Sequence, residues 1–370
     1  MTDSSPTKNA PPANDPLSTN DTPPANDSST VPGVDVGRVT EWFIANASTV
    51  APPLEFDLIA GGRSNLTYRV TDQEDGVWVL RRPPTGQVLA TAHDMVREHR
   101  IISALAPTDV PVAPVVGLCT DEAVNGAPFY VMGYVDGHVL RDAAAAESVS
   151  PDVRRRAGLS IAETLARIHA VDPDAVGLGE LGRKEGYIAR QLKRWNGQFE
   201  QSLTREVPVV TEAYQRLLQD IPVQGAPAIV HGDYRLDNCM VNDTGEVIAV
   251  LDWEICTLGD PLADLGVLMV YWTEAGDPYA ALPGAATVLE GFPTRAELVA
   301  AYEAAGGRPV GDLDYYVAFG YWKLACILEG VYARYKGGAM GNDGADADAF
   351  GDMVTLLGQA SLSYLDKIGT

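Results

Sequence analysis

The hydrophobic pattern of this 370-residue chain changes from the period of strands to the period of helices. Five short runs with the alternation typical of β-strands come first, at 54–62, 66–70, 77–81, 115–120 and 129–134. One helical stretch precedes these runs at 36–47 and another lies among them at 93–105. Helical stretches dominate later, at 153–171, 187–203 and 319–335. Strands grouped before helices indicate an α+β protein, with a small antiparallel sheet in one lobe and a larger helical lobe.

The start of the chain has a composition that opposes folding. Residues 1–30 contain six prolines and no aromatic residue, and the pentapeptide PPAND occurs twice among them. Such a segment cannot bury enough apolar surface to offset the entropy lost on ordering. We therefore predict a disordered tail at 1–34, an N-lobe at 35–133 and a C-lobe at 134–370.

Charge and cysteine content exclude several classes of function. Fifty acidic against 27 basic residues leave a net charge of −23, which speaks against nonspecific binding to nucleic acid or anionic lipid. The four cysteines are far apart and form no C-x-x-C pair, so neither a disulfide framework nor a zinc site is expected. No secretory leader or membrane-spanning run is recognised. We expect a cytoplasmic protein without a nucleic-acid or membrane partner.

A polar loop followed by a hairpin is the main candidate for chemistry. The loop HGDYRLDN at 231–238 follows the apolar run AIV, and a hairpin is predicted at 239–251, with DWE after it. Antiparallel pairing brings Asn238 and Asp252 together. An amide oxygen beside a carboxylate is a suitable ligand pair for Mg²⁺, which prefers hard oxygen donors.

Two further charged residues of this loop point to catalysis. Asp233 can face the same cavity as a base, and Arg235 can present a cation there. An Asp or Asn in a polar loop is most often a turn former, so no single one of these residues identifies a site. Their order and spacing together favour a functional loop. His231 is expected to brace the loop rather than to react.

A glycine-rich loop in the N-lobe is the candidate for phosphate binding. The segment AGGRSNLTYRV places Gly61 and Gly62, then Ser64 and Asn65, between two predicted strands. Glycines leave backbone N–H groups accessible to a phosphate. The alternative is an ordinary hairpin turn.

An ion pair is predicted between the sheet and the helical stretch 93–105. Glu98 falls in the apolar stripe of that helix, where an ionised carboxylate needs a partner. Arg81 shares a strand face with Val77 and Val79 and therefore points inward. Arg81 and Glu98 form the natural pair, and the alternative is an ordinary surface salt bridge.

The layout H-G-D-x-x-x-x-N, then a hairpin, then D-W-E resembles the aminoglycoside phosphotransferase and choline kinase superfamily. More narrowly, the run from HGDYRLDN to GDPLADL is similar to phosphotransferase domains found alone in bacteria and fused to acyl-CoA dehydrogenases in animals. The resemblance covers residues 36–340 and implies a bilobal protein-kinase-like fold. It also implies an enzyme that moves the γ-phosphoryl group of ATP to a hydroxyl of a small molecule.

The resemblance also implies roles for the catalytic loop. Asp233 would accept or orient the hydroxyl proton, and Arg235 would neutralise charge on the transferring group. Asn238 and Asp252 would hold Mg²⁺. Positioning and charge neutralisation are the main catalytic contributions to such a transfer.

On the nucleotide side, the resemblance implies that Arg81 and Glu98 position the α and β phosphates, with arginine in a place more often filled by lysine. The backbone around Met132 to Tyr134 would read the adenine edge. One rival is a catalytically silent nucleotide-binding module, which need not keep all of these residues. Another rival is a protein kinase, against which H-G-D and the helical insert at 153–203 argue.

The sequence leaves the acceptor open. Arg190 and Arg194 lie on one face of the helix at 187–203, which suits an anionic acceptor such as a hydroxyacyl-CoA or hydroxy acid, although a solvated face is the common alternative. A cationic acceptor, such as an amino alcohol or an aminoglycoside, would favour aromatic and acidic groups. The chain offers these at Tyr271, Trp272, Glu274, Asp277 and Trp322. Trp272 is the aromatic residue that we include among the acceptor-site predictions.

Two polar residues are expected to be structural. Asp260 precedes Pro261, a pattern typical of a helix N-cap. His169 lies on the apolar side of its helix and is predicted to be a hydrogen-bonded core residue.

Overall fold

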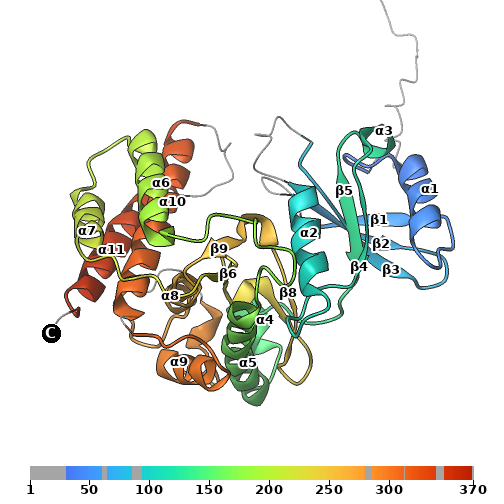
Figure 1. Ribbon diagram of the computed structural model, residues 1–370. Helices are drawn as coiled ribbons and strands as arrows, with labels where there is room; N and C mark the ends of the chain where they lie inside the picture. Colours follow the sequence, from blue (N-terminus) through green and yellow to red (C-terminus); the bar gives the residue numbers. More distant parts are fainter. Residues whose placement is uncertain are drawn as a thin grey trace, which may run out of the picture.

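The computed structural model describes residues 31–60, 65–85, 94–279, 285–311, 313–338 and 346–368, arranged as two lobes (Figure 1). The N-lobe is built on one antiparallel sheet in the order β1-β2-β3-β5-β4. Its strands are β1 (Glu55–Ala60), β2 (Leu66–Thr71), β3 (Val77–Arg82), β4 (Val115–Cys119) and β5 (Phe129–Gly133). All five predicted strands are therefore confirmed in the expected lobe.

The two faces of this sheet belong to different hydrophobic cores. Helix α1 (Val36–Asn46) buries Val39 and Phe43 in a small core with one face of the sheet. Helix α2 (Met95–Leu105) covers the face toward the C-lobe, and its side chains are continuous with the C-lobe core (Figure 1). A short helix, α3 (Glu122–Asn125), precedes β5.

The C-lobe is mainly helical. Its α-helices are α4 (Ala143–Glu147), α5 (Pro151–Ala170), α6 (Tyr187–Ser202), α7 (Pro208–Gln219), α8 (Leu262–Tyr271), α9 (Arg295–Ala304), α10 (Leu313–Lys336) and α11 (Ala347–Leu365). Helices α8 and α10 approach closely because Gly266 and Gly320 lie between them; a Cβ on Gly266 would come within 2.4 Å of the Tyr316 carbonyl oxygen. Helix α10 begins six residues before the predicted 319, because it is buried on nearly all sides there and shows little helical period.

Two small sheets lie between the lobes and hold the polar loops. Strand β6 (Ala228–Val230) pairs with β9 (Thr257–Gly259), and β7 (Cys239–Val241) pairs with β8 (Val247–Val250) as the predicted hairpin. Single 3₁₀ turns are η1 (Leu236–Asn238), η2 (Trp253–Ile255) and η3 (Ala286–Val288). Because β6 leads into residue 231 and β8 leads into residue 251, both polar loops start from fixed strand ends.

Helix α2 is also tied to the C-lobe by hydrogen bonds. Arg97 donates to the Leu181 carbonyl over 3.0 Å, and Arg100 donates to the Gly177 carbonyl over 2.7 Å. Both carbonyls belong to the connection between α5 and α6. Within the described ranges, none of the helices has the length and apolar character needed to cross a membrane.

Candidate active site

The loop after β6 is fixed by a buried carboxylate of α8. Asp264, which has no exposed surface, accepts hydrogen bonds from the amides of His231 at 2.6 Å and Gly232 at 2.8 Å. Burial alone would raise the pKa of Asp264, but His169, His231 and the Gly232 amide hold it below its ordinary value. Gly232 has φ +88, which suits glycine. The loop is therefore held at its backbone.

His231 braces the loop, as predicted. Its Nδ1 accepts a hydrogen bond from the Asp233 amide at 3.3 Å, so Nε2 carries the proton and donates to the Leu251 carbonyl at 2.8 Å. This imidazole joins the end of β6 to the end of β8. It is a structural link between the two polar loops.

A second histidine stands behind Asp264. The Tyr302 hydroxyl accepts from the Arg308 amide at 3.1 Å, so it donates its own hydrogen to His169 Nδ1 at 2.8 Å. His169 Nε2–H therefore faces Asp264 at 3.5 Å. The predicted core role of His169 is confirmed.

The expected helix cap is displaced by one residue. The helix α8 starts at Leu262, with Pro261 as its N-cap residue, yet the Asp260 carboxylate accepts from the Leu262 amide at 3.2 Å. Asp260 is buried and also accepts from the Tyr316 hydroxyl at 2.8 Å. Its role is structural.

Asp233 and Arg235 lie together at the mouth of a hollow. The Asp233 carboxylate is 3.2 Å from the Arg235 guanidinium and accepts from the Asn238 amide group at 3.0 Å. Arg235 also pairs with Asp237 at 2.8 Å and lies over the Tyr271 ring at 4.9 Å. Burial would lower the pKa of Arg235, but Asp233 and Asp237 raise it, so the guanidinium stays charged.

Asn238 and Asp252 are neighbours, as the hairpin predicts. The Leu251 amide donates to the Asn238 carbonyl at 2.8 Å. Because the side-chain NH₂ of Asn238 faces Asp233, its amide oxygen is left for another partner. Asp252 has a positive φ of 61, an unusual backbone for a residue other than glycine, and strained backbone is frequent at functional sites. One Asp252 oxygen is bonded to Arg81 at 2.6 Å, so its second oxygen and the Asn238 amide oxygen are the hard donors that would suit Mg²⁺.

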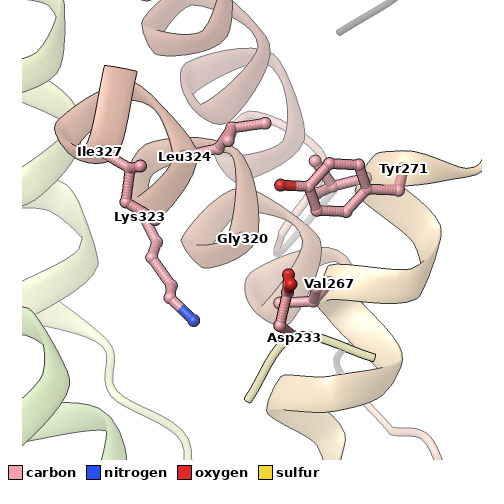
Figure 2. Close-up of a pocket in the computed structure, with 8 residues that line it drawn as sticks. Asp233, Val267, Tyr271, Gly320, Lys323, Leu324 and Ile327 are labelled. Carbon is pink, nitrogen blue, oxygen red and sulfur yellow. The ribbon is translucent and has the colours of Figure 1, made fainter. Parts of the chain in front are cut away.

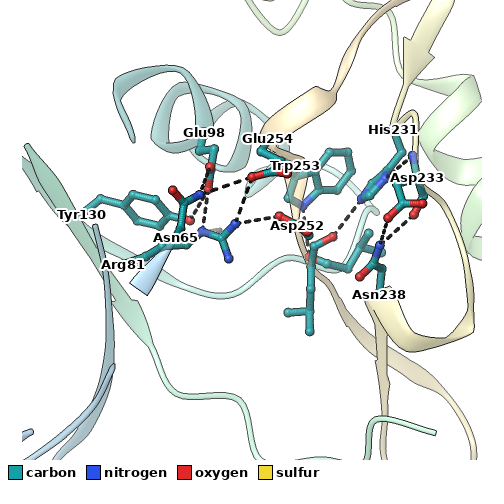
Figure 3. Close-up of polar contacts among 12 residues, drawn as sticks. Asn65, Arg81, Glu98, Tyr130, His231, Asp233, Asn238, Asp252, Trp253 and Glu254 are labelled. Atoms are coloured by element: carbon teal, nitrogen blue, oxygen red, sulfur yellow. Dashed lines mark hydrogen bonds and ion pairs between the residues drawn. The ribbon is translucent and has the colours of Figure 1, made fainter. Parts of the chain in front are cut away.

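Arg81 connects the two lobes (Figure 3). Its guanidinium is 2.9 Å from Glu98, 2.6 Å from Asp252 and 4.0 Å from Glu254. The predicted pair of Arg81 and Glu98 is present, and it is no surface salt bridge, because the Glu98 side chain is only 3% exposed. Burial alone would lower the pKa of Arg81, but its acidic neighbours raise it.

Glu98 is held from three sides. Asn65 donates to one carboxylate oxygen at 2.9 Å, while the Tyr130 hydroxyl donates to the other at 3.0 Å. Burial raises the pKa of Glu98, and Arg81 opposes this rise. Asn65 was predicted to lie in the phosphate-binding loop, but its side-chain NH₂ group binds the Glu98 carboxylate. Gly61, Gly62 and Ser64 lie outside the described residues.

Glu254 is a further carboxylate of this site. Burial raises its pKa to about 7, with Asp252 as the next cause, while Arg81 opposes the rise. Its neighbours, described above, are Arg81 and Asp252. The site therefore has a titratable acid near neutral pH beside the candidate metal ligands.

The backbone predicted to read the adenine edge, Met132 to Tyr134, lies partly inside the sheet. Met132 lies inside β5, where it pairs with Val79 and Val115. Tyr134 follows the strand, and its amide makes only a long hydrogen bond of 3.4 Å to Val77. The backbone free of the sheet thus begins at Tyr134.

A small hollow adjoins Asp233, with a cavity volume of about 20 Å³ and a mouth open to solvent (Figure 2). Its lining is apolar except for Asp233, Tyr271 and Lys323. The residues are Asp233, Val267, Val270, Tyr271, Gly320, Lys323, Leu324 and Ile327. The enclosed part has room for a group of about the size of a water, such as a hydroxyl beside Asp233, and the apolar walls continue to its mouth.

The three residues proposed for acceptor binding are placed differently. Arg194 is exposed on α6 and lies over the neighbouring Trp195 ring at 5.5 Å. Arg190 is half-buried and donates to the Arg183 carbonyl at 2.6 Å. Trp272 is 1% exposed, and its N–H donates to the Pro293 carbonyl at 2.8 Å. This burial speaks against the predicted Trp272 contact with an acceptor, because the ring has no free face to offer.

Sequence reasoning missed Asp264, Glu254 and Lys323 as site residues. The signal for Asp264 was a carboxylate inside the apolar helix LADLGVLMVY, and for Lys323 it was a lone cation in FGYWKLACIL. Charges inside apolar helices are rarely buried without a reason. Glu254 was part of the DWE motif, but no periodicity singled it out.

Comparison with known proteins agrees with this geometry. The model of the phosphotransferase enzyme family matches residues 55–312. The Mus musculus protein named acyl-CoA dehydrogenase family member 10 is 34% identical over 332 residues, covering 86% of this chain and 30% of that protein. The chain thus spans about a third of the length of the curated relatives it matches.

Solved structures show the same architecture. A Ralstonia eutropha structure assigned as an aminoglycoside phosphotransferase is 34% identical, with a TM-score of 0.76 over 90% of this chain and 98% of that chain. Choline kinase from Cryptosporidium parvum is 10% identical, with a TM-score of 0.61 over 90% of this chain and 96% of that chain. This distant likeness concerns the fold, and the expected bilobal kinase-like architecture is confirmed.

Proposed function

The chain belongs to the phosphotransferase enzyme family of small-molecule kinases, and on that premise we propose that it transfers the γ-phosphoryl group of ATP, with Mg²⁺, to a hydroxyl of a small molecule. One observation carries the proposal. The base candidate Asp233, bonded to Asn238, opens onto a hollow with mostly apolar walls, while Arg81 reaches Asp252 on the adjoining loop.

Asp233 is the proposed catalytic base. Its side chain is 32% exposed and is held by Asn238 and Arg235, so its carboxylate has a fixed direction toward the hollow. A hydroxyl bound there would be oriented by this carboxylate and would pass its proton to it as the bond to phosphorus forms. Arg235 would offset the negative charge near the transferring group.

The proposed metal ligands are Asn238 and Asp252, with Glu254 close by. A magnesium ion bound by these oxygens would supply charge neutralisation for the phosphates. Among the described residues there is no group of three or more His, Cys, Asp or Glu side chains that could hold a metal. Two protein ligands are nevertheless usual for Mg²⁺ in kinases, which keeps water and phosphate in its shell.

Arg81 is the proposed phosphate contact. Glu98 fixes one side of the guanidinium, as Asn65 and Tyr130 in turn fix Glu98. Gly61, Gly62 and Ser64 would cover the phosphates, and the backbone from Met132 to Tyr134 would contact the base. A planar guanidinium presents a fork of donors, so two phosphate oxygens could be bound at once.

A hydroxy acid or hydroxyacyl-CoA is the proposed acceptor. The apolar walls beside Asp233 and the cationic Arg190 and Arg194 on α6 support it, as does the name of the acyl-CoA dehydrogenase relatives. The cationic alternative has less support. Glu274 and Asp277 are already paired with Arg295, at 3.7 and 2.7 Å.

The test is ADP release with Mg-ATP across hydroxy acids, hydroxyacyl-CoAs, amino alcohols and aminoglycosides. Asp233→Asn should lower kcat by about 100- to 10,000-fold with the best acceptor, as expected for loss of a general base. Asp243→Asn is the matched control, because that carboxylate is 94% exposed on the hairpin tip. ATP binding without acceptor-stimulated turnover would contradict the proposal and favour a silent binding module.

A further inference from the structure

Lys323 of α10 lies in the hollow beside Asp233 and has no role in the steps above (Figure 2). Its residue is 8% exposed, and Nζ donates a hydrogen bond to the Gly232 carbonyl at 2.9 Å. An ammonium has three N–H donors. Within the described part of the chain, its partners are that carbonyl and the Trp195 ring, whose centroid is 5.6 Å from Nζ, and no carboxylate lies within ion-pair distance.

A charge in this position is costly to the fold. The neighbours of Lys323 along α10, Trp322, Leu324 and Ala325, are all buried. Burial lowers the pKa of Lys323, an effect that Asp233 and Asp264 oppose from a distance and Arg194 reinforces. An apolar side chain of similar length would avoid this cost. The Trp195 ring offsets only part of this cost, because it is a neutral partner.

Support of the catalytic loop is the simplest alternative role. However, His231 and Gly232 are already held through their amides by Asp264. A carbonyl oxygen needs only one neutral donor, and the other donors of the ammonium would stay unused. Both partners of the ammonium, the Gly232 carbonyl and the Trp195 ring, are neutral, so it can still bind an anionic or electron-rich oxygen.

We propose that Lys323 determines acceptor specificity by binding a carboxylate or carbonyl oxygen of the acceptor while the acceptor's hydroxyl lies at Asp233. The inference rests on the proposed function and adds a residue to it. The apolar side chains of Val267, Val270 and Leu324 would contact the carbons between the two oxygen groups. The acceptor class is thus a compact hydroxy compound with a second, electron-rich oxygen on the same chain.

The experiment compares a hydroxy acid with the diol of the same carbon skeleton as acceptors. Lys323→Met removes the charge, whereas Lys323→Gln keeps an N–H donor for Gly232. Both variants should raise KM for the hydroxy acid about 10- to 100-fold, the effect of losing a charge-assisted hydrogen bond. The KM for ATP, the KM for the diol and kcat should stay within about threefold of wild type. Lys336→Met is the control, since that lysine lies on the same helix and pairs with exposed Asp348.

Other outcomes overturn the inference. An equal loss of kcat on both acceptors, or full recovery in Lys323→Gln, means that Lys323 only supports the loop. Wild-type enzyme that uses diol and hydroxy acid equally well overturns this inference and leaves the proposed function intact. ADP release that no acceptor stimulates overturns the proposed function, and this inference with it. If Lys323→Met does not fold, Lys323→Gln alone decides the comparison.

Discussion

The proposed nucleotide side and the proposed acceptor side of the site differ in how their charges are paired. On the nucleotide side, Arg81 lies within 4.0 Å of Glu98, Asp252 and Glu254, so charges are paired before any ligand arrives. On the proposed acceptor side, Lys323 has only neutral partners, the Gly232 carbonyl and the Trp195 ring, in a hollow with mostly apolar walls. The first arrangement gives a preorganised site for a ligand of constant shape. In the second arrangement, the choice of acceptor depends on very few side chains.

The largest expected effect concerns the paired side. Arg81→Met should lower kcat/KM for ATP by about 100- to 1,000-fold, because the proposed phosphate contact is lost. It should also lower the free energy of unfolding by about 3 kcal/mol, since Glu98 stays buried without its cation. Denaturant unfolding and steady-state kinetics measure the two effects. In Arg81→Met/Glu98→Gln the stability should recover largely, while ATP use should not. Recovery of both would show that Arg81 is only a structural ion-pair partner.

A smaller effect is expected behind the catalytic loop. Asp264→Asn replaces one acceptor of two backbone amides by a donor, so His231 or Gly232 loses its partner. We expect kcat to fall about 10- to 100-fold and unfolding free energy to fall by about 2 kcal/mol. Asp366→Asn, which removes an exposed partner of Arg216, is the control. Unchanged kcat in Asp264→Asn would show that the loop keeps its geometry without this carboxylate.

The smallest expected effect is a pH dependence at Glu254. Its pKa of about 7 is raised above that of the unfolded chain, so stability is lost as its carboxyl ionises, from about pH 4 up through about pH 7. With a chelator present, Glu254→Gln should raise Tm by about 2 °C at about pH 8 and by almost nothing at about pH 4. Mg²⁺ should reduce this gain. A gain that is equal at both pH values would contradict the assignment.

Much of this site was accessible from the sequence because its parts follow local periods. Arg81 lies on an inward strand face and Glu98 in an apolar helix stripe, so their pairing was predicted. The hairpin placed Asn238 beside Asp252, and the order of motifs indicated the family that the comparisons show. The backbone supports of the loop were less accessible. His231 and Asp264 meet across a sequence separation of 33 residues, which no local pattern encodes.

The acceptor side was harder to predict for a physical reason. Helices α8 and α10 are buried on most sides, so their hydrophobic pattern has no polar face that would show where a hollow lies. Trp272 was expected near an acceptor because aromatic rings suit a cationic ligand, but its ring is part of the core. Lys323, which lies in α10, was not predicted as a site residue. The residues 61–64 lie outside the described part of the chain, so the phosphate loop stays a prediction.

The two ties between α2 and the α5–α6 connection have a mechanical consequence. Glu98 is bonded to Asn65, Arg81 and Tyr130 of the N-lobe, whereas Arg97 and Arg100 of the same helix are bonded to the C-lobe. The contact of Arg81 with Asp252 crosses the boundary between the lobes directly. A rotation of the sheet and α2 against the C-lobe would therefore stretch this contact together with the two hydrogen bonds of α2. Such a rotation would do work at the same guanidinium that is proposed to bind phosphate.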